Sequence, residues 1–292
     1  MKRGFTLIEL IVVVTIIGIL AAVVIVNMSG GTDRAKITKG QAFSAKIGEE
    51  LAGSLVSEWR FDEGTGSTAN DAWGVNSGTL SNSSMWRSGG NCVSGSCLEF
   101  NGTNNYIDCQ HMMNGFVNFS INIWVKTTQN TSTDYRFDDP AIIGTHQGNG
   151  DTNDFVLTNY NGNLAWYDEL TSGSNSFNTG ETIADDSWHH LFMTRLGSSL
   201  TFYIDGSNVG IDTTGTDPVR DDDIEVGRAL WSGSLYFNGL IDEVRIYNSA
   251  ASITQIQSQY LAGLNKLLSN GAISKSEYNQ RIKELSRSLV IE

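Results

Sequence analysis

The first 27 residues place a membrane-length apolar run directly after a short basic leader, residues 1–4. The stretch Phe5 to Val26 has 22 residues, and Glu9 is its only ionisable side chain. As a helix it reaches roughly 33 Å, enough to cross a hydrocarbon core of about 30 Å. A secretory signal has its small-residue cleavage site after a shorter apolar core, whereas Gly4 precedes this one. We therefore expect a retained single transmembrane helix over residues 5–27.

Glu9 needs an explanation, because a carboxylate inside a membrane helix costs up to about 3 kcal/mol and usually has a partner there. Cleavage after Gly4 would leave the Phe5 amine four residues before Glu9, where the amine of a neighbouring copy can pair with the carboxylate. The string GFTLIEL resembles the processing signature of the type IV pilin and pseudopilin family. The resemblance implies removal of the leader by a prepilin peptidase and N-methylation of Phe5. It also implies assembly with other pilin subunits, partly through Glu9.

The segment that follows, residues 28–55, predicts an amphipathic continuation of this helix and a linker. Its apolar residues recur every four positions, which makes one stripe on a helix: Phe43, Ile47, Leu51 and Leu55. The chain as a whole is acidic, with net charge −13 and a pI of about 4.7. Such a balance disfavours binding to phosphates, so we expect no nucleic-acid partner.

Residues 56–260 have a different texture, with short alternating apolar runs between clusters rich in glycine, asparagine, serine and aspartate. This pattern predicts a mainly β fold, an antiparallel sandwich or jelly roll. Asp205-Gly206 in TFYIDGSNV predicts a tight hairpin turn. Eight pieces, in order, resemble the laminin-G-like or concanavalin-A-like lectin jelly roll: WRFDEGTGSTAND, GTLSNSSMW, CLEFNGTNNYID, SINIWVK, DDSWHHLFMTR, LTFYIDG, FNGLIDEVRIYN and ASITQIQSQY. Trp124 and Trp188 fall at scaffold positions of that family, so we expect them in the core.

Glycosidases also use this fold, but the chain lacks the E-x-D-x-x-E string that aligns two catalytic carboxylates on one strand face. Instead, some of its acidic residues are direct neighbours in the sequence, in the pairs Asp62-Glu63, Asp168-Glu169 and Asp242-Glu243. On a strand, neighbouring side chains point to opposite faces. The same parity argues against His189-His190 as a metal or base pair. The sequence therefore predicts a protein that is not an enzyme.

The three cysteines allow two pairings. Strand alternation places Cys97 and Glu99 on the outward face, and Cys109 inward with Ile107. In the oxidising compartment that the topology implies, this parity favours a Cys92–Cys97 disulfide with Cys109 buried and free. A Cys97–Cys109 pairing is the alternative.

Residues 261–292 predict a helical hairpin. Four leucines share one helix face, at positions 261, 264, 267 and 268, and Asn270-Gly271 is a typical helix stop. Ser274 or Ser276 is suited to begin a second helix. The sequence leaves open whether the hairpin packs on its own jelly roll or on a partner.

Two binding expectations concern the jelly roll. The family resemblance implies a structural calcium ion, held by Asp242 with Asp62 and a carbonyl near Asn101-Gly102. A contact with surface glycans would use aromatic rings outside the scaffold, with Trp166, Tyr167 and Trp231 as candidates.

Together these features predict a pilin-like subunit whose head is a lectin-type jelly roll. It would be a single-pass protein of the inner membrane, with the head outside the cytoplasm, and then a part of a surface filament. The alternative is a pseudopilin of a secretion or uptake machine, in which the jelly roll is only a scaffold.

Overall fold

The computed structural model describes residues 51–131, 139–145, 154–170, 175–220, 223–228 and 236–288. The chain divides into two compact units, Met1–Lys46 and Ile47–Glu292, and only the second contains described residues. The predicted leader, the transmembrane helix and most of the amphipathic continuation therefore lie outside them. No helix in the described part of the chain has both the length and the apolar character needed to cross a bilayer.

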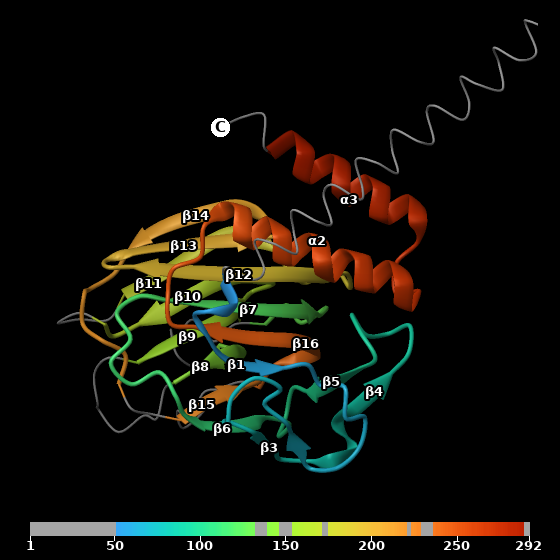
Figure 1. The fold of residues 1–292 in the computed structure, drawn as a ribbon, viewed down its shortest axis with the longest axis horizontal. Helices are drawn as coiled ribbons and strands as arrows, with labels where there is room; N and C mark the ends of the chain where they lie inside the picture. The colour runs from blue at the N-terminus through green and yellow to red at the C-terminus, as the bar shows by residue number, and fades with distance from the viewer. Residues whose placement is uncertain are drawn as a thin grey trace, which may run out of the picture. The chain divides into compact units, whose positions relative to one another are not determined.

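Two antiparallel sheets form a sandwich, which confirms the mainly β prediction (Figure 1). We call the first sheet A; its strand order is β14-β13-β12-β7-β16-β5-β4, and β1 also pairs with β16. These strands are β1 (Leu55–Trp59), β4 (Trp86–Ser88), β5 (Ser96–Asn101), β7 (Phe119–Lys126), β12 (Trp188–Leu196), β13 (Ser199–Ile204), β14 (Ser207–Thr213) and β16 (Asn238–Tyr247).

The second sheet, sheet B, has the order β11-β10-β9-β8-β15-β6-β3-β2. Its strands are β2 (Thr68–Ala69), β3 (Gly78–Leu80), β6 (Ile107–His111), β8 (Ala141–Gly144), β9 (Phe155–Tyr160), β10 (Asn163–Asp168), β11 (Asn175–Thr182) and β15 (Asp223–Val226). A short 3-10 helix, η1 (Ser83–Met85), precedes β4. Consecutive strands pair in β12-β13-β14 and in β8-β9-β10-β11, whereas the middle of each sheet joins strands from distant parts of the chain, such as β7 with β16 and β15 with β6.

The main hydrophobic core lies between the two sheets. Strand alternation decides which side chains enter it: Leu98 and Phe100 of β5 face inward, as do Ile107 and Cys109 of β6. Cys97 belongs to a separate cluster on the other face of sheet A. These placements confirm the inward and outward faces that the sequence predicts.

The hairpin between β13 and β14 also follows the prediction. Its turn residues Asp205 and Gly206 have φ values of 53° and 77°. Both angles are positive, as a two-residue turn of the primed type requires.

Two helices follow the last strand: α2 (Ile253–Asn270) and α3 (Lys275–Ser288). Helix α2 begins earlier than the predicted residue 261, because Ser252 and Gln255 form a capping box at its start. Gly271, at φ 77°, ends it where expected. The Ser274 hydroxyl then accepts a hydrogen bond from the Glu277 amide at the start of α3, at 3.1 Å.

Helix α2 packs on the outer face of sheet A, so the helical hairpin covers its own jelly roll (Figure 1). The Tyr260 ring stacks on the indole of Trp124, with ring centroids 5.9 Å apart. A Cβ atom on Gly263 would lie 2.3 Å from Trp124, so only glycine permits this approach. Trp124 and Trp188 are both buried, as expected for scaffold residues.

Two residues of the predicted helical stripe, Leu51 and Leu55, lie in the described part of the chain. Leu51 is buried and packs with Phe192 and Tyr247 of sheet A. Leu51 and Ala52 are helical and a turn follows them, in which Ser54 bonds the Leu51 carbonyl through both its amide and its hydroxyl, at 3.0 and 2.9 Å. Leu55 therefore starts strand β1, and its assignment to a helical stripe is wrong.

Candidate functional site

A buried network of charges lies on the outer face of sheet A, beneath α2. The Arg245 guanidinium bonds Glu58 at 2.7 Å and also pairs with Glu243. Arg60 bonds Glu58 at 2.6 Å, and Lys266 of α2 pairs with Glu243. Both carboxylates are buried. Burial alone would raise the pKa of Glu58, but hydrogen bonds from Arg60 and Arg245 outweigh it and hold that pKa below its usual value.

A β-bulge in β16 shapes this network. The register between β16 and β7 shifts between Asp242 and Arg245, and Glu243 has a φ of 53°. Asp242 lies opposite Trp124 on the outer face, and Glu243 reaches Lys266 of α2 on that same face. The expectation that these two carboxylates point to opposite faces is wrong, because the bulge adds a residue to the strand and interrupts its alternation.

The Asp242 carboxylate anchors the loop closed by the disulfide. It accepts hydrogen bonds from the amides of Val93 at 2.9 Å, Ser94 at 3.2 Å and Glu243 at 2.8 Å. Burial, and then the charge of Glu243, raise the pKa of Asp242 well above its usual value. The side chain thus organises a turn and is inaccessible to solvent.

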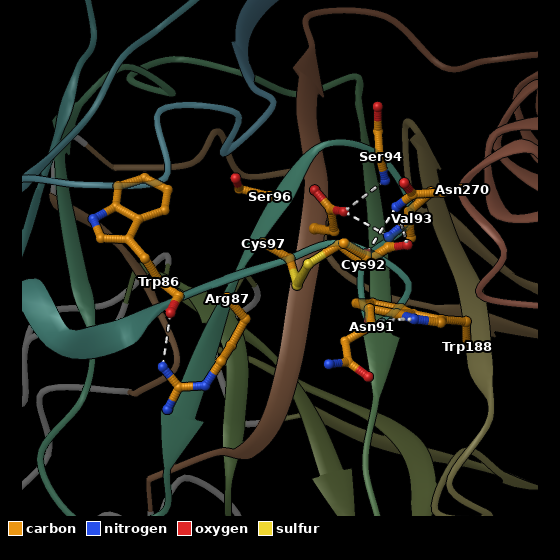
Figure 2. Close-up of a disulfide and its surroundings, with 12 residues drawn as sticks. Trp86, Arg87, Asn91, Cys92, Val93, Ser94, Ser96, Cys97, Trp188 and Asn270 are labelled. Carbon is orange, nitrogen blue, oxygen red and sulfur yellow. Dashed lines mark hydrogen bonds between the residues drawn. A yellow bond between two sulfur atoms is a disulfide. The ribbon is translucent and has the colours of Figure 1, made fainter.

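The structure contains the Cys92–Cys97 disulfide, with Cα atoms 5.4 Å apart, as the sequence favours. Figure 2 shows its loop between Asn270 and Trp188. Asn270, the last residue of α2, donates hydrogen bonds to the carbonyls of Gly89 at 2.9 Å and Cys92 at 3.0 Å. Asn270 therefore joins the β4–β5 connection, which contains this loop, to the helical hairpin.

Cys109 is the remaining cysteine, and it is buried in the core between the sheets. Cys97 lies in the cluster on the outer face of sheet A, so a Cys97–Cys109 bond does not form. Burial raises the pKa of the Cys109 thiol well above its usual value, which makes it unreactive.

The described residues do not fit the calcium site predicted at Asp62 and Asp242. Both Asp242 oxygens accept amide hydrogens, and Asp62, which is exposed, accepts the Ser96 amide at 3.4 Å. Asn101 pairs with Asn238, four residues before Asp242 and so roughly 13 Å away. Across the described segments, no group of three or more His, Cys, Asp or Glu side chains is placed to hold a metal ion. Calcium binding stays a prediction to be measured.

The rings of the two adjacent histidines, His189 and His190, have separate hydrogen-bond partners. His189 bonds Asp205 at 2.9 Å and Asp185 at 3.1 Å. Burial would lower the pKa of His189, but the two carboxylates outweigh it and raise that pKa. The His190 ring bonds the Asn122 side chain instead, at 2.7 Å, and burial lowers the pKa of this ring to about 3. The His189 ring is therefore a mostly buried ion-pair partner, and the His190 ring is a neutral buried group.

A polar groove of about 340 Å³ opens on the outer face of sheet A, beside the disulfide loop. Leu240 of β16 lies between Glu99 of β5 and Lys126 of β7, so these three side chains share that face. Glu99 pairs with Arg87, and Lys126 lies 3.5 Å from Asp186. The remaining lining residues are Asn91, Thr127, Thr128, Asn238 and Gly239. Carboxylates, amides, hydroxyls and cations of this kind suit a polar, hydroxyl-rich ligand.

Two of the aromatic candidates for a glycan contact, Trp166 and Tyr167, lie elsewhere, in β10. Trp166 is fully buried, stacked on Phe155 at 4.9 Å, and its indole donates to Asp168 at 2.6 Å. Tyr167 is 6% exposed and donates its hydroxyl to Asp139 at 3.0 Å. Neither ring presents a face to a sugar, so these two assignments are corrected. Trp231 lies outside the described residues.

Sequence reasoning missed both the groove and the charge network. Their members come from strands that are distant in the chain, such as Glu58 and Arg245, 187 residues apart. The alternation of β5 did place Glu99 outward. No local pattern identifies the partner strand that a surface charge will face.

The two-sheet sandwich, its outer helices and its polar groove define a lectin-type jelly roll. A family model described as the concanavalin A-like lectin/glucanases superfamily matches residues 101–257, more than half of the chain, and the chain belongs to this superfamily. The model of the prokaryotic N-terminal methylation motif matches residues 1–25. The suspected fusion of these two parts is thus confirmed.

Solved structures show the same fold in other settings, and one curated protein is similar in sequence to part of the chain. Domain 4 of the arabinanase AbnA from Geobacillus stearothermophilus, solved with arabinotriose, has a TM-score of 0.54 at 21% identity, over 70% of this chain and 97% of that one. The binding domain of Paraclostridial Mosquitocidal Protein 1 has a TM-score of 0.55 at 18% identity, over 74% and 53%. The adhesion G-protein coupled receptor V1 of Danio rerio is 29% identical over 155 residues, which are 48% of this chain but only 2% of the receptor.

Proposed function

We propose that the protein is a type IV pilin-like surface subunit that displays a lectin-like recognition or adhesion domain. The observation that carries this proposal is the presence, in one chain, of the N-terminal methylation motif and the jelly roll. The motif would bring the chain to a prepilin peptidase and then into a filament. The subunit is first a single-pass protein of the inner membrane, with its head outside the cytoplasm.

Processing supplies the first test. The mature chain is expected to begin at Phe5 with a methylated amine, and replacing Gly4 by a bulkier residue blocks cleavage. N-terminal mass spectrometry decides, because a mature chain that begins at Met1 or near Ser29 contradicts the proposal. A Glu9→Ala variant separates insertion from assembly: the membrane accepts the uncharged helix at least as well, whereas entry into filaments falls.

The proposed work of the head is recognition without catalysis. Asp242 and Glu243 lie together, but backbone amides, Arg245 and Lys266 occupy their oxygens. The polar groove beside the disulfide loop is the better site for a ligand, because its walls offer hydrogen-bonding groups to solvent. Two proteins of similar fold support a carbohydrate as that ligand: the AbnA domain was solved in complex with arabinotriose, and cell entry of botulinum neurotoxin type C depends on two ganglioside molecules.

A glycan array with the purified chain tests the groove. An Arg87→Ala, Lys126→Ala double variant is expected to lose binding, because it removes the two cations that line the groove. Arg287→Ala, at the far end of α3, is the matched control. Equal binding by the wild type and the double variant excludes the groove as the site.

The pseudopilin role remains the second candidate, and one observation favours it. Trp166 and Tyr167 are buried, so these rings serve the packing of the sandwich. In this role the head is a scaffold. The array then stays silent, and the chain remains within the cell envelope.

A further inference from the structure

The loop from Asn70 to Ser77 is unusual because it exposes large apolar side chains. Trp73 is 56% exposed and Val75 is 92% exposed. Among the described residues only Leu196 and Ile211 are other large apolar side chains with comparable exposure. The loop also lies outside residues 101–257, the part that matches the superfamily.

The Asp71 side chain, which is partly buried, holds the backbone of this loop in place. Asp71 accepts hydrogen bonds from the amides of Trp73 at 3.0 Å, Gly74 at 2.9 Å and Asn76 at 3.1 Å, and from the Glu58 amide of β1 at 3.0 Å. Burial would raise the pKa of Asp71, but these amides outweigh it and lower that pKa. The carboxylate therefore stays charged and keeps its four donors.

Further contacts fix the loop to the edge of β1. The Asn76 side chain donates to the Ser57 hydroxyl at 2.7 Å, and the Trp59 indole donates to the Asn76 carbonyl at 2.9 Å. A Cβ atom on Gly74 would lie 2.7 Å from the Val56 carbonyl, so the loop touches the strand there. Rigid loops lose little conformational entropy on binding, and an exposed tryptophan on such a loop is typical of an interface hot spot.

We propose that the Trp73–Val75 tip of this loop is a contact between the heads of neighbouring copies of this chain. The proposal rests on filament assembly through the N-terminal segment. That segment joins the described chain at Leu51, five residues before Val56, and so at most about 17 Å of chain from the loop. Copies joined through their N-terminal segments bring this part of each head close to the next copy.

Charge also favours an apolar contact here. The full chain carries a net charge of −13, and removal of residues 1–4 also takes away the positive charges of Lys2 and Arg3, so processed copies in contact repel one another. A tryptophan and a valine bury apolar surface without adding charge. Contacts in an open helical filament join two different patches, so the tip of one copy meets another surface of the next.

Two experiments with the full-length chain test the contact. In Trp73→Ala, the chain recovered in sheared filaments is expected to fall at least tenfold, while N-terminal processing and the amount in the membrane stay as in the wild type. Leu196→Ala, which removes a side chain that is 65% exposed on β12, is the control and leaves filaments unchanged. Because the Trp73 ring is exposed, the melting temperature of the variant also stays unchanged.

The second experiment identifies the neighbour. Val75→Cys labelled with benzophenone maleimide gives, on illumination of intact filaments, an adduct with the mass of two copies. The native cysteines do not compete, because two form the disulfide and Cys109 is buried. Peptide mapping then finds the second site on the same chain.

The outcomes separate this proposal from the one on which it rests. Wild-type levels of Trp73→Ala in filaments, with no copy-to-copy adduct at Val75→Cys, overturn the contact and leave the pilin role standing. Loss of glycan-array binding by Trp73→Ala with normal assembly overturns it in favour of a sugar site. A wild-type chain that is neither processed nor found in filaments overturns both proposals.

Discussion

The two faces of sheet A are buried by different kinds of contact. The inner face packs on sheet B with apolar side chains such as Phe100, Ile121 and Ile246. The outer face packs on α2 with aromatic rings and a network of ion pairs, centred on Arg245. An apolar face tolerates substitutions of similar volume, whereas removing a buried partner from an ion pair leaves an uncompensated buried charge. The outer face is therefore the part of the head that is more sensitive to single changes.

Among single substitutions on the outer face, Arg245→Met should lower the free energy of unfolding most. It leaves Glu58 and Glu243 buried with fewer cations, at an expected cost of about 3–5 kcal/mol of unfolding free energy. Arg60→Met is the matched control, because it removes a second partner of Glu58 whose own side chain is 52% exposed, at a cost of about 0–1 kcal/mol. Urea unfolding followed by tryptophan fluorescence measures both. Equal losses in the two variants contradict the account.

His190, on the outer face of sheet A, should make the free energy of unfolding depend on pH. Its pKa is about 3 in the folded chain against about 6.5 when unfolded, so the unfolded state binds the extra proton between these values. Stability is thus lost as the pH falls below 6.5, by about 2 kcal/mol at pH 5.

His190→Gln keeps a donor for Asn122 and cannot take up the proton, so its loss between pH 7 and pH 5 is smaller than that of the wild type. His189 has the opposite sign, because its raised pKa gives stability that is present below pH 6.5 and lost as the pH rises through the folded value. The difference between variant and wild type isolates His190. Parallel stability curves for the two chains would show that the ring is not buried neutral.

The Cys92–Cys97 disulfide should contribute less to the free energy of unfolding than Arg245 does. Replacing Cys92 and Cys97 by serine removes a closed loop of a few residues, worth about 2 kcal/mol in the loop-entropy model. The loosened loop also weakens the hold on Asn270 at the end of α2. Thiol titration checks the pairing, since the unfolded oxidised chain should show a single reactive thiol, at Cys109. Reactive thiols at Cys92 or Cys97 would contradict it.

Calcium gives the smallest expected effect. Because amide hydrogens occupy the oxygens of Asp242, adding EDTA should leave the melting temperature unchanged. A drop on EDTA that calcium restores would show that an ion binds after all. An Asp62→Asn variant then tells whether the site includes this exposed carboxylate.

The side chains of the inner face could be predicted from the sequence, whereas the charge network of the outer face could not. A period of two along β5 and β6 indicates which side chains enter the core, and Asn270-Gly271 marks the end of α2. The start of α2 was also readable, because Ser252 and Gln255 have the spacing of a capping box. The bulge at Glu243 and the pairing of Glu58 with Arg245 were not, since they depend on which distant strands become neighbours.

The candidate sites divide in the same way. The Cys92–Cys97 pairing follows from strand parity, a local property. The burial of Trp166 and Tyr167 depends on the second sheet and on β10 lying within it, which no adjacent residue reveals. The sequence does contain a local signal for Trp73, because an aspartate, a tryptophan and a glycine lie within one short turn-rich segment.

Immunogold labelling of surface filaments, with an antibody against the head, tests the central claim most directly. The account predicts gold particles on filaments, along their length or at their tips, in cells that carry the wild-type chain. The same cells with Gly4 replaced by a bulkier residue should show none, since the leader is then retained. Labelling confined to the cell envelope in wild-type cells would contradict a filament subunit that displays a recognition domain.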